Sequence, residues 1–300
     1  MISGLLVVNK SKNITSHEVV EKIRLFDNTT KVGHFGTLDP MAEGILLIGI
    51  GKATKFFDFY IQKKKQYSGK IRFGLATTTY DKEGSPVSEE KKIDLNTVNI
   101  NSLLKQFTGQ INQVPPAFSA KKFKGKPLYK YAREKKQVIL KPVQITIYSL
   151  KARIINHNTL AFEALTSAGT YIRSLAHDIG EHLKVGAYLE ELRRDRIGEF
   201  DLSQAISSDT ISEEMKVSDF FKQVIPIESL LPEFPKIIIN PAGKRGVLNG
   251  APLLPKDILK IFPSESTTHY RLFDEEGNLL GISQKDKKIR RFNPFIVFPD

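Results

Sequence analysis

Cysteine is absent from this 300-residue chain, and its absence excludes disulfide bonds, cysteine-based zinc sites and thiol catalysis. Long apolar runs are absent as well, because none reaches the roughly 18 residues that a membrane-spanning helix needs. The first residues lack the basic and then apolar pattern of a secretion signal. We therefore expect a soluble, cytoplasmic protein that does not associate with membranes.

Acidic side chains are in short supply relative to basic ones. Lys and Arg number 45 against 33 Asp and Glu, which gives a formal net charge of +12 and a pI near 9.5. Such an excess favours a polyanionic partner. A membrane surface is the weaker alternative, because no basic amphipathic helix stands alone. Hydrophobic residues make up 40% of the chain, which is enough for one large domain or two unequal ones.

Glycine and proline interrupt residues 33–44, Gly-His-Phe-Gly-Thr-Leu-Asp-Pro-Met-Ala-Glu-Gly, and exclude a regular helix or strand there. Asp39 precedes Pro40, so its backbone is pushed into extended or turn geometry and its carboxylate is held on a stiff loop. Apolar residues 45–50 follow and predict a buried strand. An Asp-Pro pair is more often a plain turn than a catalytic site, and the spacing alone leaves both interpretations open.

The whole twelve-residue string resembles the motif Gly-His-x-Gly-Thr-Leu-Asp-Pro-x-Ala-x-Gly of the bacterial tRNA pseudouridine synthase B (TruB-like) family, and the resemblance covers about residues 1–230. It implies an α+β pseudouridine-synthase fold, in which helices and loops flank a central mixed, largely antiparallel sheet. It also implies that Asp39 is the catalytic nucleophile. His34 is then expected to occupy the space that a flipped-out base vacates.

Two further segments resemble motifs of this family. Residues 67–73 alternate between two faces as a half-buried strand does, and in most proteins Tyr67 would be a core residue. The resemblance implies instead that Tyr67 stacks on the target base and takes part in removing its proton. Residues 169–173 match the family string Gly-Thr-Tyr-Ile-Arg at the entry to a helix. Here the resemblance implies that Arg173 pairs with the catalytic aspartate and that Tyr171 lines the uridine pocket.

The predicted site therefore consists of two overlapping sets. The catalytic residues are Asp39, Tyr67 and Arg173. The resemblance implies that Leu192, which precedes two arginines, belongs to the binding pocket. We add Lys10 and Lys55 to the predicted binding residues. The predicted substrate-binding residues are His34, Tyr67, Tyr171, Leu192, Lys10 and Lys55.

Eight basic residues lie between positions 121 and 136, interleaved with Phe123, Tyr129 and Tyr131 and with one acid, Glu134. A charge run is usually a solvated helix face, but cations mixed with aromatic rings are a stronger signature of nucleic-acid binding. The segment resembles the insertion, about residues 113–140 here, that grips the T arm of tRNA in the family. Its lysines are expected to neutralise phosphates, so binding should weaken as salt rises.

Two patterns suggest other chemistry and are weaker. Residues 49–54 look like a phosphate-binding loop, but the required upstream glycine and the Ser or Thr after the lysine are missing. His177, Asp178, Glu181 and His182 suggest a metal site, but their spacing is one residue off both known zinc-helix patterns and no third group converges on them. We therefore predict neither a metal nor a cofactor.

Composition and periodicity predict the elements around these motifs. A capping box at Thr15 begins a helix, and residues 94–107 read as another. Residues 138–154 and 160–165 are rich in β-formers, and residues 203–231 predict helical segments.

A proline-rich stretch at residues 232–235 indicates a linker. It divides a catalytic domain, residues 1–231, from a second domain, residues 236–300, that resembles the RNA-binding PUA domain. That domain is expected to be β-rich. Its predicted short strands are residues 237–239, 246–250, 270–273 and 279–282.

The resemblance implies an enzyme that isomerises uridine 55 in the T loop of tRNA to pseudouridine. The base would be flipped out of its stack, and Asp39 would form a covalent intermediate without a cofactor. Attack on the sugar C1′ and on the base C6 are both open. The alternatives are a guide-RNA-dependent pseudouridine synthase and a non-catalytic tRNA-folding or RNA-binding protein. We expect a monomer.

Overall fold

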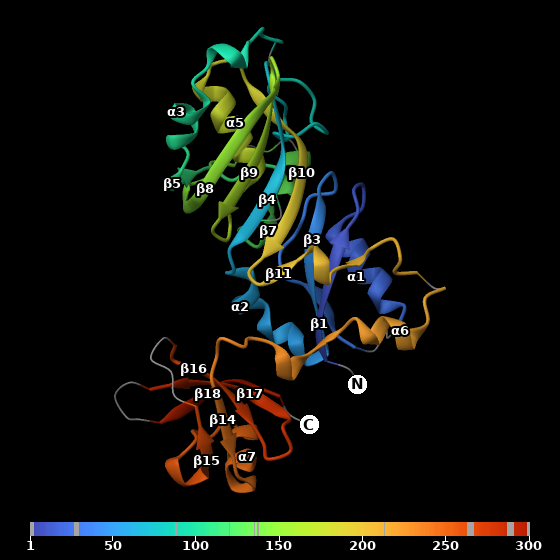
Figure 1. The fold of residues 1–300 in the computed structure, drawn as a ribbon, viewed down its shortest axis with the longest axis vertical. Helices are drawn as coiled ribbons and strands as arrows, with labels where there is room; N and C mark the ends of the chain where they lie inside the picture. The colour runs from blue at the N-terminus through green and yellow to red at the C-terminus, as the bar shows by residue number, and fades with distance from the viewer. Residues whose placement is uncertain are drawn as a thin grey trace.

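The structure is a computed structural model, and it describes residues 3–26, 30–87, 89–119, 121–134, 136, 138–212, 214–262, 267–286 and 291–298. Two large sheets dominate it (Figure 1). Helices cover parts of both, so the class is α+β as predicted. Among the residues described, no helix combines the length and apolar character needed to cross a membrane.

The first sheet is mixed and largely antiparallel, as predicted. Its strand order is β12-β1-β3-β10-β4-β9-β8-β5, with β2 on β3, β11 on β10 and β13 on β1. Among the strands described, the β1–β12 and β3–β10 pairs of this sheet are parallel and its other pairs are antiparallel. The strands are β1 (Gly4–Lys10), β2 (Val32–His34), β3 (Glu43–Ile50), β4 (Lys65–Phe73), β5 (Gly109–Gln113), β8 (Val143–Asn156), β9 (Thr159–Thr166), β10 (Ala187–Ile197), β11 (Phe200–Asp201), β12 (Ile206–Ser207) and β13 (Ile225–Pro226).

The helices near this sheet begin largely where the sequence signals lie. In the predicted capping box before α1 (Ser16–Arg24), the Thr15 hydroxyl accepts from the Glu18 amide while the Glu18 carboxylate accepts from the Thr15 amide. The helix α5 (Ile172–His182) begins within the predicted 169–173 motif and packs on β10. The remaining helical segments are η1 (Gly51–Phe56), α2 (Phe57–Ile61), η2 (Leu95–Thr97), α3 (Ile100–Lys105), α4 (Leu128–Arg133), η3 (Leu202–Gln204), α6 (Val217–Lys222) and η4 (Ile227–Ser229).

Two predicted helical stretches are wrong in extent. The predicted helix at 94–107 is split into η2 and α3, because the Asn99 side chain accepts from the Ser102 amide and so caps a new helix. Residues 203–231 contain α6 and short 3₁₀ turns, but also the strands β12 and β13.

The second sheet begins at Lys236, just after the predicted linker, and has the order β15-β14-β16-β17-β18. The predicted strand at 246–250 is wrong, because residues 246–248 end a helix. The Asn240 side chain caps that helix at the Gly243 amide, and Pro241 occupies its first turn. The elements are β14 (Lys236–Ile239), α7 (Pro241–Leu248), η5 (Pro255–Asp257), β15 (Ile258–Ile261), β16 (His269–Phe273), β17 (Leu279–Lys285) and β18 (Phe292–Val297).

One apolar cluster is shared by the two sheets. Leu5 and Phe56 from the first sheet's side pack in the same cluster as Ile282 and Phe298 from the second. The Phe56 and Phe298 rings meet edge to face with centroids 5.5 Å apart. The buried Arg271 guanidinium also donates to main-chain carbonyls of the connecting segment. The second sheet is therefore packed on the first through a common core.

Candidate active site

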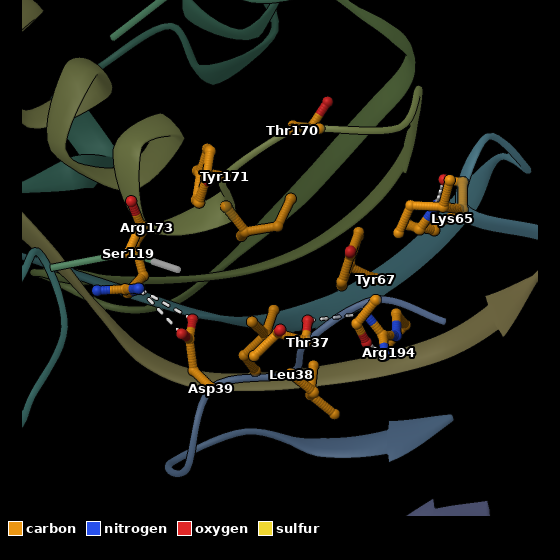
Figure 2. Close-up of a pocket in the computed structure, with 15 residues that line it drawn as sticks. Thr37, Leu38, Asp39, Lys65, Tyr67, Ser119, Thr170, Tyr171, Arg173 and Arg194 are labelled. Carbon is orange, nitrogen blue, oxygen red and sulfur yellow. Dashed lines mark hydrogen bonds and ion pairs between the residues drawn. The ribbon is translucent and has the colours of Figure 1, made fainter. Parts of the chain in front are cut away.

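A carboxylate and a guanidinium, 134 residues apart in sequence, meet beside a cavity (Figure 2). Arg173 Nε donates to Asp39 Oδ2 and Nη2 donates to Asp39 Oδ1, both at 2.9 Å. The Arg173 side chain is 6% exposed and the Asp39 side chain 31%. Two parallel charge-assisted bonds fix the plane of the carboxylate while leaving one side of it accessible.

Three further groups hold the Arg173 guanidinium. Nη1 donates to the Thr79 carbonyl and Nη2 to the Phe118 carbonyl, each at 2.9 Å. Nη1 also lies 3.5 Å from Asp81 Oδ2. The guanidinium thus donates four hydrogen bonds and forms a second ion pair, and three separate chain segments fix its position.

Asp81 is one residue of this site that sequence reasoning missed. Its side chain is only 5% exposed, and its Oδ1 accepts from the Thr79 hydroxyl and the Glu83 amide. The stretch 77–84 reads as a turn in sequence, and it is one, but nothing in that pattern says that its carboxylate faces Arg173. A lysine and a second acid, Lys82 and Glu83, follow directly, so the sequence does not show which of these charged side chains is buried.

Buried cations under the Asp39 loop hold its backbone. Lys10 has no exposed surface, and its Nζ donates to the carbonyls of Ser11 and Ile14 at 2.8 Å and of Pro40 at 3.3 Å. Burial lowers the pKa of Lys10 to about 8. Lys10 is not among the residues that line the cavity, so its predicted contact with substrate stays a prediction. Lys10 instead braces the loop.

Arg194 supports the loop from the other side. It is 2% exposed, and its three nitrogens donate to the carbonyls of Ile45, Thr37 and Gly36. The backbones also approach closely here, because a Cβ on Gly44 would lie 2.3 Å from the Arg194 carbonyl oxygen and Gly44 has a φ of +107°. The glycine that ends the motif is therefore required by packing.

The cavity beside the ion pair has a volume of about 220 Å³. This is smaller than the ~300–1,000 Å³ typical of pockets for drug-sized ligands, and it suits a single planar group. Tyr67, Tyr171 and Leu192 line it, as predicted for the pocket, and the two tyrosine rings flank the space in Figure 2. Burial raises the pKa of Tyr171, so its hydroxyl stays protonated at neutral pH.

Lys65 also lines this cavity and was not predicted. Its side chain is buried, and Nζ donates to the carbonyls of Ile61 and Lys63 at 2.7 and 2.8 Å. Burial, with a smaller contribution from the Arg194 charge, lowers the pKa of Lys65 to about 8. The wall opposite Asp39 is therefore cationic at neutral pH.

Two predicted binding residues lie elsewhere. His34 is on β2 and is not among the lining residues; burial lowers its pKa, which leaves the imidazole neutral near pH 7. Lys55 Nζ donates to the Val297 carbonyl at 2.7 Å and lies 5.7 Å from the centre of the Phe298 ring. Lys55 is not among the lining residues and instead contacts the second sheet, so its predicted role in substrate binding stays a prediction.

The weak metal motif on α5 has other contacts. His177 stacks on Tyr80, and His182 meets Phe107 edge to face. Within the described ranges, no group of three His, Cys, Asp or Glu side chains has metal-binding geometry.

The basic segment forms a compact unit next to the site. A two-stranded hairpin, β6 (Lys122–Phe123) and β7 (Lys126–Pro127), leads into α4. Lys126 and Lys136 both pair with Glu134, and these contacts lower the pKa of Glu134 to about 2. The Tyr129 amide donates to the Ser119 carbonyl at 3.1 Å, next to the residue whose carbonyl holds Arg173. The basic unit is thus directly connected to the cavity wall.

Comparisons with known proteins agree with this geometry. Residues 24–172 match the model of the TruB family pseudouridylate synthase N-terminal domain, and residues 173–232 match that of the tRNA pseudouridylate synthase B C-terminal domain. The chain is 41% identical over 258 residues to "tRNA pseudouridine synthase B" of Aquifex aeolicus, covering 85% of this chain and 88% of the relative. It is 36% identical over 296 residues to the protein of that name from Clostridium kluyveri, covering 98% and 100%.

Solved structures show the same fold at lower identity. The archaeal box H/ACA sRNP Nop10-Cbf5 complex contains a chain with a TM-score of 0.70 and 23% identity, covering 99% of this chain and 86% of that one. An H/ACA RNP bound to a substrate RNA containing 2′-deoxyuridine gives a TM-score of 0.68 at 24% identity, covering 99% and 85%.

Proposed function

Because this chain belongs to the TruB family of pseudouridylate synthases, we propose that it isomerises uridine 55 in the T loop of tRNA to pseudouridine. The observation that carries the proposal is the Asp39 carboxylate, which Arg173 holds in place at the edge of a cavity lined by two tyrosines. That arrangement suits a nucleophile aimed at one extruded nucleotide.

The reaction moves one bond and needs no net oxidation or reduction. The N1–C1′ bond of uridine breaks, a C5–C1′ bond forms, the proton on C5 leaves and N1 gains a proton. Asp39 forms a transient covalent bond, either to C1′ of the sugar or to C6 of the base. Tyr67 stacks on the base and assists removal of the C5 proton, while Tyr171 and Leu192 enclose it.

The rest of the chain supplies the grip on RNA in this proposal. Exposed lysines of the 121–136 segment neutralise phosphates of the T arm, and the adjoining rings support stacking. The second sheet is proposed to be a PUA-like RNA-binding domain. The enzyme is proposed to act as a cytoplasmic monomer.

A guide-RNA-dependent synthase is the alternative that the solved structures raise, since similar chains occur in H/ACA particles. Those likenesses lie below 25% identity and support the fold alone. The relatives of 36–41% identity are named tRNA pseudouridine synthase B and favour an enzyme that works without a guide.

The test is to incubate the isolated chain with an unmodified tRNA transcript carrying 5-tritiated uridine. We expect tritium release, and a pseudouridine at position 55 when the product is mapped. A transcript with cytidine at position 55 serves as the control and should release none. Activity only on addition of a guide RNA would transfer the chain to the guide-dependent class. Binding without tritium release would make it a non-catalytic RNA-binding protein.

A further inference from the structure

A histidine–tyrosine stack lies one helical turn from Arg173. The rings of Tyr80 and His177 are nearly parallel, with centroids 3.8 Å apart and planes 7° from each other. His177 follows Arg173 by four residues on α5, so both side chains lie on the same side of that helix. Tyr80 lies between Thr79 and Asp81, and each of these supplies an acceptor to Arg173 Nη1.

Tyr80 adopts a backbone conformation that its side chain disfavours. Its φ is +63°, in the left-handed region that is uncommon for a bulky residue. Such a conformation persists only when surrounding contacts maintain it, and strained backbone positions cluster at active sites. The conformation has a visible result here, because the Thr79 carbonyl and the Asp81 carboxylate on either side both face one guanidinium.

The histidine contributes its ring rather than a hydrogen bond to this arrangement. His177 Nδ1 is buried and has no hydrogen-bond partner among the described residues. Burial also lowers the pKa of His177, so the ring is neutral at physiological pH. A neutral aromatic ring lying flat on a tyrosine is suited to packing.

We propose that Tyr80 and His177 are positioning residues for the reaction: their stack holds the strained 79–81 turn so that it aligns Arg173, and through it Asp39. This inference rests on the proposed function, since it concerns the rate of that reaction. Neither ring is among the residues that line the cavity. Without it the turn relaxes, and Arg173 Nη1 is then deprived of two acceptors at once.

A second set of contacts gives the competing explanation. The Leu189 amide donates to the Tyr80 carbonyl at 2.9 Å and the Lys82 amide donates to the Leu189 carbonyl at 3.0 Å, so β10 pins the backbone of the turn as well. If those bonds suffice, the two rings are dispensable. Tyr80→Gly separates the two explanations, because glycine accepts a φ of +63° without strain but has no ring.

The experiment measures single-turnover tritium release and tRNA affinity for matched variants. For Tyr80→Ala, Tyr80→Gly and His177→Ala we expect the rate to fall roughly three- to tenfold with unchanged tRNA affinity. This factor corresponds to the interaction energy of one aromatic pair converted to a ratio of rates. Tyr80→Phe and His177→Phe keep a stack and should restore most of the rate. The control is His182→Ala, which removes a histidine from another aromatic contact on the same helix and should keep the wild-type rate.

The outcomes are distinguishable. Wild-type rates in Tyr80→Gly and His177→Ala would overturn the inference and leave the proposed function standing. The same holds if affinity falls as much as the rate, or if His182→Ala is equally slow. Absence of tritium release by the wild-type chain would instead remove the proposed function, and the inference with it. Melting temperatures identify a variant that fails to fold, and the substitutions at the other ring then decide.

Discussion

The Asp39 loop and the basic 121–136 unit are held by opposite kinds of contact. Under the loop, Lys10 and Arg194 are almost fully buried, and each donates hydrogen bonds to three backbone carbonyls. The charged side chains of the basic unit instead form exposed ion pairs centred on Glu134. Buried, fully bonded groups fix a geometry, whereas exposed pairs are individually worth about 0–1 kcal/mol and exchange partners readily.

This difference separates two tasks. In the proposed function, the Asp39 carboxylate must be placed before the substrate arrives, because misplacement by about 1 Å is costly in catalysis. A surface that grips a polyanion gains from cations that can move from an internal acid to a phosphate. The two regions should therefore respond differently to substitution, the first mainly in rate and the second mainly in affinity.

Asp39→Asn should have the largest effect. The amide cannot act as the nucleophile, so tritium release should fall by roughly 10³-fold or more, the scale found when a nucleophile is removed from other enzymes. Affinity for tRNA, measured by filter binding, should change little, because the substitution removes few contacts to RNA. Normal turnover by this variant would remove Asp39 from the mechanism.

Arg173→Lys should come next. Lysine keeps the charge but cannot donate to both Asp39 oxygens and to the Phe118 and Thr79 carbonyls together. We expect the single-turnover rate to fall roughly a hundredfold, comparable to removal of one preorganised electrostatic donor elsewhere. The buried Asp81 also loses its contact with Arg173 Nη1, which should lower the free energy of unfolding in urea by about 1–3 kcal/mol.

The matched control for that variant is Arg193→Lys. Arg193 is 49% exposed and pairs with Asp195 at the surface, so neither rate nor stability should change by more than the experimental error. Equal losses in both variants would show that Arg173 has no special position.

Neutralising the basic unit should change affinity rather than rate. For Lys122, Lys124 and Lys130, replaced together by alanine, we expect weaker tRNA binding and a salt dependence flatter by about 0.7–0.9 log units for each phosphate that is no longer neutralised. The rate at saturating tRNA should stay near wild type. The control replaces three exposed lysines elsewhere, Lys92, Lys105 and Lys216, and an equal change in slope there would reduce the effect to net charge.

Glu134→Gln should have the smallest effect and the opposite sign. It releases Lys126 and Lys136 from their internal acid, so tRNA should bind roughly two- to fivefold more tightly at low salt, as expected when weak exposed pairs are broken. Glu275→Gln makes the same change in net charge on an exposed turn of the second sheet. An equal gain in that control would show that Glu134 does not restrain the lysines.

Most of the site could be predicted from sequence because motifs carry long-range information that residue chemistry lacks. Nothing local to residues 39 and 173 says that they meet, and the family resemblance supplied that pairing. Lys10 and Lys55 show the limit, because a lysine in a motif can serve RNA or backbone carbonyls equally well. Asp81 was missed because the carboxylate's partner lies on a helix 92 positions later in the chain.

The fold was predictable where local signals and burial agreed. The capping box at Thr15 and the apolar strand at 45–50 are examples, and both are confirmed. The predicted strand at 246–250 failed although the correct signal was present, since an asparagine before a proline at 240–241 is a helix start. The predicted helix at 94–107 failed because Asn99 offers the backbone a competing cap.

The aromatic contact between Phe56 and Phe298 affects how a long ligand can bind, because it holds the two sheets together. Because the two sheets share one apolar core, the distance between the cavity and the second sheet is set before a ligand binds. In the proposed function, an RNA that contacts both the cavity and the second sheet must span that fixed distance. Removing the second sheet at the linker would expose this apolar core to water, which favours aggregation, and would also remove the fixed distance.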